Sequence, residues 1–204
     1  MPNLKIESQY LGPVGGVDEV GRGPWAGPVV AAVAVFLDTN SIPSALFKGI
    51  EDSKKLTKQK RDHLYEQLIA LQDFQYGIGE ASVDEIDSLN ISKATFLAME
   101  RAVQKLPSLP PTLLIDGKFI PSFPGTKTVP VIGGDGISLS IAAASIIAKV
   151  TRDNLMAELA REFPHFGWER NAGYGTAQHQ EALKVQGITQ HHRKSFAPIR
   201  ALIP

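Results

Sequence analysis

Apolar residues along the chain form two kinds of pattern, continuous runs and stripes with a helical period. Residues 29–37 are almost wholly apolar, which predicts a central strand buried on both faces. Residues 14–20 lie just before this run and are expected to form the other arm of a hairpin. Apolar positions alternate over residues 74–78, as in a half-buried strand. Shorter apolar runs at residues 112–115 and 126–132 predict two further strands.

Helices are predicted where apolar residues recur with a 3.6-residue period behind a capping side chain. Thr57 is a suitable N-cap, and Ser82 with Glu85 has the spacing of a capping box. Pro164 stops the longest helix, and Gly187 closes the last one. The predicted helices cover residues 57–71, 82–106 with a restart at Asn90, 138–163 and 176–186.

This order of strands and helices predicts an α/β fold, with helices on the faces of a mixed sheet. No repeat, low-complexity tract or linker divides the sequence. We therefore expect residues 1–204 to form one domain, with a helical C-terminal part over about 165–204.

The amino-acid composition limits which metal ligands, which location and which binding partners can be expected. The chain has no cysteine, so any metal must be held by oxygen or histidine ligands. No apolar run reaches the roughly 20 residues of a membrane span, and the first residues lack a signal-peptide core, so a cytoplasmic protein is expected. The net charge is zero, yet residues 48–61 carry six basic against two acidic side chains, and residues 184–204 carry four basic and no acidic ones. Such local patches suit a phosphate backbone, although solvated helix faces and a basic tail are the commoner explanation.

Four carboxylates come at or near the ends of apolar strands and close to glycine: Asp18, Glu19, Asp116 and Asp135. Active sites in open α/β sheets gather where strands end, which favours one shared site. Carboxylates that lie together raise one another's pKa, so cations are needed to keep them all ionised. Mg²⁺ suits such ligands, and a pair of ions can promote phosphodiester hydrolysis. Spacing alone fits equally well with Asp116 and Asp135 being ordinary turn residues.

A glycine turn follows the acidic pair. Gly21 and Gly23 have no Cβ and tolerate positive φ, so their backbone can approach a ligand closely, and Arg22 between them can grip a phosphate or carboxylate. Asp18 and Glu19 occupy neighbouring strand positions and so point to opposite faces. We expect a backbone bend to bring both into one site. A glycine-rich hairpin with two solvated acids is the structural alternative.

The segment GVDEVGRGP at residues 16–24 resembles the first signature of ribonuclease HII, the type 2 ribonuclease H family. Further blocks of that family follow in its order: DSKKL at 52–56, Asp116, Asp135 before SLSIAAASIIAKVTRD at 138–153, and GYGT at 173–176 with His179. The resemblance covers most of the chain. It implies a ribonuclease H-like mixed sheet flanked by helices, with a C-terminal helical extension.

The resemblance also implies an activity. Family members hydrolyse the RNA strand of RNA–DNA hybrids and nick duplex DNA 5′ of embedded ribonucleotides, leaving 5′-phosphate and 3′-hydroxyl ends. The implied partners are therefore RNA–DNA hybrids and ribonucleotide-containing DNA duplexes, with no membrane, and we expect a monomer. The implied cofactors are two Mg²⁺ or Mn²⁺ ions.

Residue roles follow from the same resemblance. Asp18, Glu19, Asp116 and Asp135 match the family's catalytic metal ligands. The backbone of Gly21, Arg22 and Gly23 would read the ribose 2′-hydroxyl, which distinguishes RNA from DNA. Tyr174 would stack on the following deoxyribose, and Lys54 would contact a phosphate. The structural alternatives are a tyrosine packed on a glycine turn and an exposed lysine.

One departure from the family is Gly133, where many members have lysine, which puts part of the local phosphate affinity in question. Outside these blocks, structural roles are expected. His191 and His192 are adjacent and lack a spaced third ligand, so we expect a solvated tail. Asp153 is expected to pair with Arg152 or Lys149. Trp25 and Trp168 are expected to be packing or rim residues.

Two alternative functions remain open. One is a protein that binds hybrids without cleaving them, which retention of all four acids disfavours. The other is a nuclease of the same broad fold that acts on DNA alone. It would leave Tyr174 and the glycine turn without a sugar to read.

Overall fold

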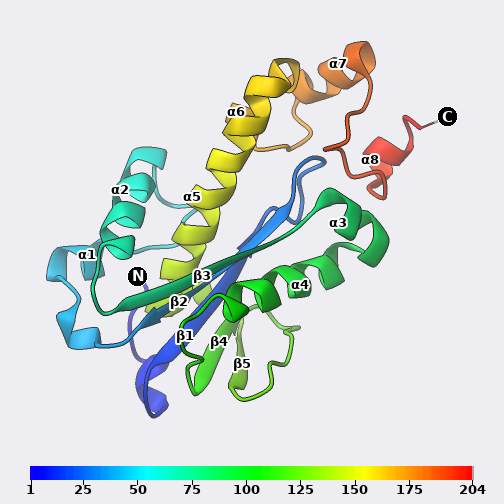
Figure 1. Ribbon diagram of the computed structural model, residues 1–204. Coiled ribbons are helices and arrows are strands. Elements are labelled where there is room, and N and C mark those ends of the chain that lie inside the picture. Colours follow the sequence, from blue (N-terminus) through cyan, green and yellow to red (C-terminus); the bar gives the residue numbers. More distant parts are fainter. Residues whose placement is uncertain (204) are drawn as a thin grey trace.

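A five-stranded mixed sheet runs through the centre of the computed structural model, which describes residues 1–203 (Figure 1). Its strand order is β3-β2-β1-β4-β5. The three strands from β3 to β1 are antiparallel, whereas β1, β4 and β5 are parallel. The strands are β1 (Val14–Val20), β2 (Val29–Phe36), β3 (Phe74–Ala81), β4 (Thr112–Asp116) and β5 (Lys127–Val131). The predicted hairpin and all five predicted strands are confirmed.

The helices lie on both faces of the sheet and beyond one end of it (Figure 1). The α-helices are α1 (Ser44–Gly49), α2 (Lys58–Ile69), α3 (Val83–Leu89), α4 (Ile91–Gln104), α5 (Leu139–Glu162), α6 (Trp168–Asn171), α7 (Ala177–Gln186) and α8 (Ala197–Arg200). Short 3₁₀ turns are η1 (Glu7–Gln9), η2 (Thr39–Ser41), η3 (Gly134–Gly136) and η4 (Pro164–Phe166). Among residues 1–203, no helix combines the length and apolarity that crossing a membrane requires.

The helix starts are where the capping residues predict them. The side chain of Thr57 accepts the Lys60 N–H, and Ser82 with Glu85 forms the complete capping box. Asn90 takes a positive φ of 72° and caps α4, which explains the restart between α3 and α4. The six-residue helix α1 was not predicted, because a helix that short shows too few periods.

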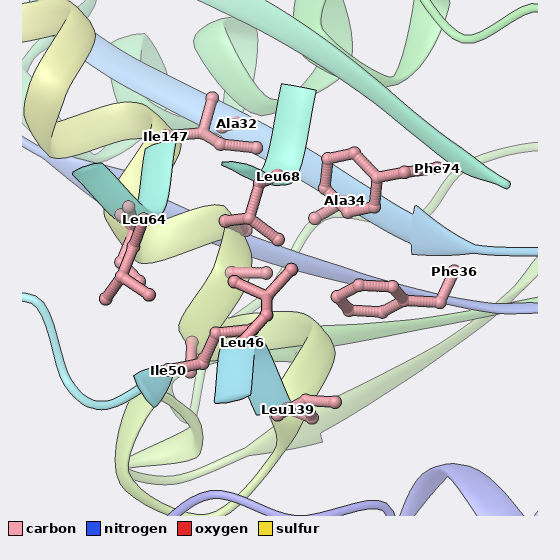
Figure 2. Close-up of a cluster of buried hydrophobic side chains, with 14 of the residues drawn as sticks. Ala32, Ala34, Phe36, Leu46, Ile50, Leu64, Leu68, Phe74, Leu139 and Ile147 are labelled. Carbon is pink, nitrogen blue, oxygen red and sulfur yellow. The ribbon is translucent and has the colours of Figure 1, made fainter. Parts of the chain in front are cut away.

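Strand β2 is buried along its whole length, as its apolar run predicts. Ala32, Ala34 and Phe36 face α5, α1 and α2, where Figure 2 shows them among Leu46, Leu64, Leu68 and Ile147. The alternate residues Ala31, Val33 and Val35 face α3 and α4 on the other side. The sheet therefore has an apolar core on each face, and α5 and α4 are the main covering helices.

Helix α5 packs very closely on β1. A β-carbon built on Gly16 would lie 2.1 Å from the backbone carbon of Ser140, so only glycine fits there. The N-terminus of α5 is also held by Glu7, whose Oε1 accepts the Ser138 hydroxyl at 2.6 Å and the Ser140 N–H at 3.0 Å. The start of the longest helix is thus fixed against the middle of the sheet.

Candidate active site

The parallel arrangement of β1 and β4 brings the first acids together. The register pairs Val17 with Ile115, so Asp18 and Asp116 are the next residues on two adjacent strands running the same way. Asp135 lies in η3, four residues after β5 ends. Three acids from distant parts of the sequence therefore meet at one end of the sheet, where its parallel strands have their carboxyl ends.

Asp18 is the most enclosed of these acids, with only 5% of its surface exposed. Its Oδ1 accepts the Glu19 N–H at 2.8 Å. Burial, followed by the charges of Glu19 and Asp116, raises the pKa of Asp18 well above its usual value, whereas that N–H and the side chain of Ser145 on α5 help to lower it. The site therefore resists full ionisation unless a cation is nearby.

Glu19 joins the same site without the backbone bend that we expected. Strand β1 keeps an unbroken register with β2 through Val20, with Asp18 opposite Ala32 and Glu19 opposite Ala31. Pairing with β4 instead stops at Val17, which leaves the end of β1 open on that side. Burial raises the pKa of Glu19, Arg22 opposes the shift, and the charge of Asp116 adds to it.

Asp116 and Asp135 are linked through the turn that follows β5. Asp116 Oδ1 accepts the Gly134 N–H at 2.7 Å, so one acid fixes the backbone that carries the other. Burial raises the pKa of Asp116, the Gly134 bond lowers it, and the charge of Asp135 raises it further. Gly133, the N-cap of η3, has a φ of 65°, a conformation that glycine adopts more easily than lysine.

Lys54 places a positive charge among these acids. Its Nζ lies 3.3 Å from Asp135 Oδ2, and its backbone N–H donates to Asp52. Burial lowers the pKa of Lys54, but the charges of Asp135 and Asp18 outweigh this and leave it above its usual value. Its charge also lowers the pKa values of Glu19 and Asp116. Lys54 thus offsets part of the negative charge of all four acids.

The donor set fits a hard divalent cation, because all four groups offer carboxylate oxygens and partial burial favours their neutralisation by bound charge. Within residues 1–203, however, no three His, Cys, Asp or Glu side chains converge closely enough to form a ready metal cage. Mg²⁺ characteristically keeps several waters and takes only one or two carboxylates. The open arrangement suits that kind of binding.

The glycine turn is held from behind by a residue that the sequence did not point to. Arg193, which is fully buried, donates to the carbonyl oxygens of Gly21 at 2.6 Å and Arg22 at 3.0 Å. The N–H groups of Arg22 and Gly23 have no hydrogen-bond partner among residues 1–203. The Arg22 side chain pairs with Glu19 at 3.3 Å. The turn therefore presents donors outward, and Gly21 takes the positive φ of 93° that this geometry needs.

Tyr174 lies beside the same turn. It is 51% exposed, and a β-carbon built on Gly23 would come within 3.3 Å of its ring atom Cε1. The Tyr174 N–H donates to Asn171, and the neighbouring Gly173 carbonyl accepts the Trp25 N–H at 2.8 Å. An exposed aromatic face thus flanks the free donors of the turn.

The expectation of a solvated histidine tail is wrong. His192 is fully buried, and its Nε2 lies 2.9 Å from Nε2 of His179, which is also fully buried. His191 packs edge-on against Phe163. The apolar cluster around Trp168 covers these rings. No single periodic stripe marks this cluster, because its members come from the end of α5, from separate turns and from short helices.

Acidification should destabilise this histidine pair. Burial and the neighbouring His179 lower the pKa of His192 to about 4, whereas an unfolded histidine titrates near 6.5. The unfolded chain thus takes up the proton first, so the stabilisation is complete above pH 6.5 and is lost as the pH falls towards 4. We expect the unfolding free energy of the parent to fall by roughly 2–3 kcal/mol relative to His192→Gln over that range. Urea denaturation in EDTA at pH 7 and pH 4.5 measures it, and parallel losses in both proteins would contradict it.

The remaining sequence expectations have simpler outcomes. Asp153 pairs with Lys149 as expected and also with Arg61 at 3.4 Å. Arg152 does not pair with Asp153. It donates instead to three backbone carbonyls. Trp168 is a packing residue, and Trp25 covers Gly175.

Comparison with known proteins identifies the family. The model of the family described as Ribonuclease HII matches residues 15–199. The chain belongs to the ribonuclease HII family. Ribonuclease HII of Paramagnetospirillum magneticum is 56% identical over 98% of this chain and 97% of its own length, and that of Gluconobacter oxydans is 54% identical over 100% and 97%. The protein is therefore a metal-dependent endoribonuclease that acts on RNA–DNA hybrids.

Solved structures agree on the fold. Ribonuclease H2 from Pyrococcus horikoshii superposes with a TM-score of 0.73 at 27% identity, over 93% of this chain and 96% of the other. Bst-RNase HIII in complex with Mn²⁺ gives a TM-score of 0.69 at 20% identity, over 95% and 70%, which supports the fold alone. The ribonuclease H-like mixed sheet and the helical C-terminal part are thus confirmed.

Proposed function

We propose that this ribonuclease HII also nicks duplex DNA on the 5′ side of an embedded ribonucleotide. The proposed reaction is two-metal phosphodiester hydrolysis that leaves a 5′-phosphate and a 3′-hydroxyl. The proposal rests on one observation: four mutually interacting carboxylates lie together at one end of the sheet, next to the glycine turn. In that turn, the N–H groups of Arg22 and Gly23 have no partner among the described residues. We further propose that residues 1–204 act as one catalytic unit, as a monomer in the cytoplasm.

Each carboxylate has a proposed part in holding the ions. Asp18, Glu19, Asp116 and Asp135 would supply the oxygen ligands for two Mg²⁺ or Mn²⁺. When bound, such ions activate a water and stabilise the leaving oxygen. The Mn²⁺ complex of Bst-RNase HIII, a protein of the same fold, is consistent with binding of Mn²⁺. Lys54, held beside Asp135, would move its ammonium to the substrate phosphate once the ions neutralise the carboxylates.

The free donors beside the acids would select the sugar. The N–H groups of Arg22 and Gly23 can donate to a ribose 2′-hydroxyl, and a deoxyribose leaves them unpaired. An unpaired donor in a closed site costs binding energy, which makes the turn selective against DNA. The exposed ring of Tyr174 lies where it can stack on the next sugar.

A cleavage assay tests the function directly. Three duplexes of one sequence are incubated with Mg²⁺ or Mn²⁺: all DNA, DNA with one ribonucleotide, and a continuous RNA–DNA hybrid. We expect a single nick 5′ of the lone ribonucleotide, cleavage of the hybrid at several positions, and an intact DNA control. Cleavage of all three would indicate a nuclease without sugar selection. Binding without any product would indicate a protein that only recognises hybrids.

Tyr174→Ala should lower the preference for junctions without abolishing activity. Removing the ring takes away a sugar contact worth about 1 kcal/mol, so the kcat/KM ratio of the single-ribonucleotide duplex to the hybrid should fall by roughly fivefold. Tyr174→Phe, which keeps the ring, is the matched control. Equal ratios for all three proteins would remove Tyr174 from substrate recognition.

A further inference from the structure

Two adjacent buried residues in the C-terminal segment hold both halves of the proposed sugar-reading surface. These residues are His192 and Arg193, neither of which is solvent-exposed. They lie between α7 and α8, far in the sequence from the turn at Gly21 and outside the acidic cluster. Arg193 contacts the glycine turn, and His192 is linked through His179 to Tyr174.

All three nitrogen atoms of the Arg193 guanidinium donate hydrogen bonds to backbone carbonyl oxygens. Beyond the bonds to Gly21 and Arg22, its Nε donates to Gly27 at 2.9 Å. No carboxylate pairs with it among the described residues, and burial lowers the pKa of Arg193 to about 9. An unpaired buried charge is costly, and that cost is offset here by three carbonyls of one loop. These bonds turn the carbonyls of Gly21 and Arg22 inward, which leaves the N–H groups of Arg22 and Gly23 for a ligand.

His192 acts in the other direction through a chain of hydrogen bonds with only one consistent proton arrangement. The Thr189 N–H donates to His192 Nδ1 at 2.9 Å, so the His192 proton is on Nε2. That proton points to Nε2 of His179, which also accepts the Trp168 N–H at 3.4 Å. His179 must then carry its proton on Nδ1, from which it donates to the Tyr174 carbonyl at 2.9 Å.

The carbonyl at the end of this chain belongs to the residue whose ring lies against the glycine turn. It also accepts the Thr176 N–H at 2.8 Å, so its direction is fixed by two donors. Trp25 tightens the arrangement, because its N–H binds Gly173 and its carbonyl accepts the Arg193 N–H at 2.8 Å. The turn, the tyrosine and the C-terminal segment are thus tied to one another by backbone bonds.

We infer that His192 and Arg193 are positioning residues for ribose recognition, Arg193 by turning the donors of the glycine turn outward and His192 by fixing Tyr174 through His179. The inference rests on the proposed function, since it assumes that the turn and Tyr174 read the sugar. Neither residue is assigned contact with substrate. Their predicted effect is on discrimination between sugars.

Binding of two duplexes tests the proposed role of Arg193. In an Asp135→Asn background, which should bind without cutting, affinity is measured with Mg²⁺ for all-DNA and single-ribonucleotide duplexes. We expect about tenfold tighter binding of the ribonucleotide duplex, a preference of one hydrogen bond's size. Adding Arg193→Gln should reduce that preference to about one while the affinity for all DNA stays within about twofold. Arg193→Lys should be intermediate, and the exposed Arg200→Gln should leave the preference unchanged.

The outcomes separate the inference from the function that it assumes. If the Asp135→Asn protein alone shows no preference, the proposed sugar reading fails. If that preference is present and Arg193→Gln keeps it, the positioning role of Arg193 is overturned. Should Arg193→Gln not fold, Arg193→Lys decides, because full retention of the preference would contradict the role. A purely structural role lowers the active fraction equally for both duplexes and leaves their ratio unchanged.

Two conservative variants of His179 test the proposed role of the histidine chain in the active enzyme. His179→Asn keeps an N–H donor in place of Nδ1, whereas His179→Gln keeps only an acceptor in place of Nε2. Both variants break the chain, His179→Gln at the Tyr174 carbonyl and His179→Asn at His192. We therefore expect the kcat/KM ratio of single-ribonucleotide duplex to hybrid to fall by roughly fivefold in His179→Gln and by a smaller factor in His179→Asn. A parental ratio in His179→Asn would overturn the role of His192, and a parental ratio in His179→Gln would overturn the role of the whole histidine chain.

Discussion

Asp135→Asn should abolish turnover while leaving the enzyme folded. The substitution removes one of the four proposed oxygen ligands and the charge that pairs with Lys54, so the proposed ions would be held less firmly. We expect kcat/KM on the hybrid to fall by about a thousandfold or more, equivalent to roughly 4 kcal/mol of transition-state stabilisation. Steady-state cleavage with Mg²⁺ measures it. Glu158→Gln, an equal loss of charge at an exposed position of α5, should change nothing.

Thermal unfolding separates a lost catalytic group from a damaged fold. Burial and like charges raise the pKa values of Asp18 and Asp116, so the ionised acids work against folding when no cation is bound. Asp18→Asn and Asp135→Asn should therefore unfold in EDTA at the same temperature as the parent or higher. Mg²⁺ should stabilise the parent more than either variant. A variant that unfolds earlier than the parent in EDTA would show that the acid has a structural role instead.

The local parts of the structure could be predicted from sequence because their causes are local. Thr57 and the Ser82–Glu85 capping box act on backbone only a few residues away, and the apolar run in β2 requires burial wherever the strand is placed. The acids at the strand ends were recognisable for a similar reason. Their convergence was expected from the rule that sites gather at strand ends and from the family resemblance, but spacing alone did not specify the parallel pairing of β1 with β4 that places Asp18 beside Asp116.

The residues that the sequence did not reveal are those whose partners are distant backbone atoms. Arg193 looks like part of a basic tail, yet its three acceptors lie more than 160 positions earlier in the chain. His192 looks like half of a solvated pair, yet it is enclosed by Trp168 and Phe166. Backbone carbonyls carry no sequence signal, so a buried cation that binds them cannot be told from an exposed one. The resemblance of the GYGT block at residues 173–176 to the family was the one sequence feature that indicated a functional role for the C-terminal part of the chain.

Gly16→Ala should destabilise the fold strongly, although it adds only one methyl group. The added carbon would lie 2.1 Å from the backbone carbon of Ser140 and 2.2 Å from the Ile141 nitrogen, and neither belongs to a side chain that can move aside. Helix α5 would have to shift away from β1, the strand that carries Asp18. We expect a loss of about 3 kcal/mol in unfolding free energy, the upper end of the usual cost of overpacking. Urea denaturation with and without Mg²⁺ measures it.

Gly136→Ala is the matched control for this prediction. It also adds one methyl group to a glycine near the acids, but its β-carbon would meet no atom within 4 Å and its φ is not positive. Its unfolding free energy should stay the same or rise by up to about 1 kcal/mol, because alanine restricts the unfolded chain. Similar losses for both variants would mean that glycine is needed for flexibility around the site. A loss confined to Gly16→Ala would support close packing of α5 on β1 as the reason that position 16 requires glycine.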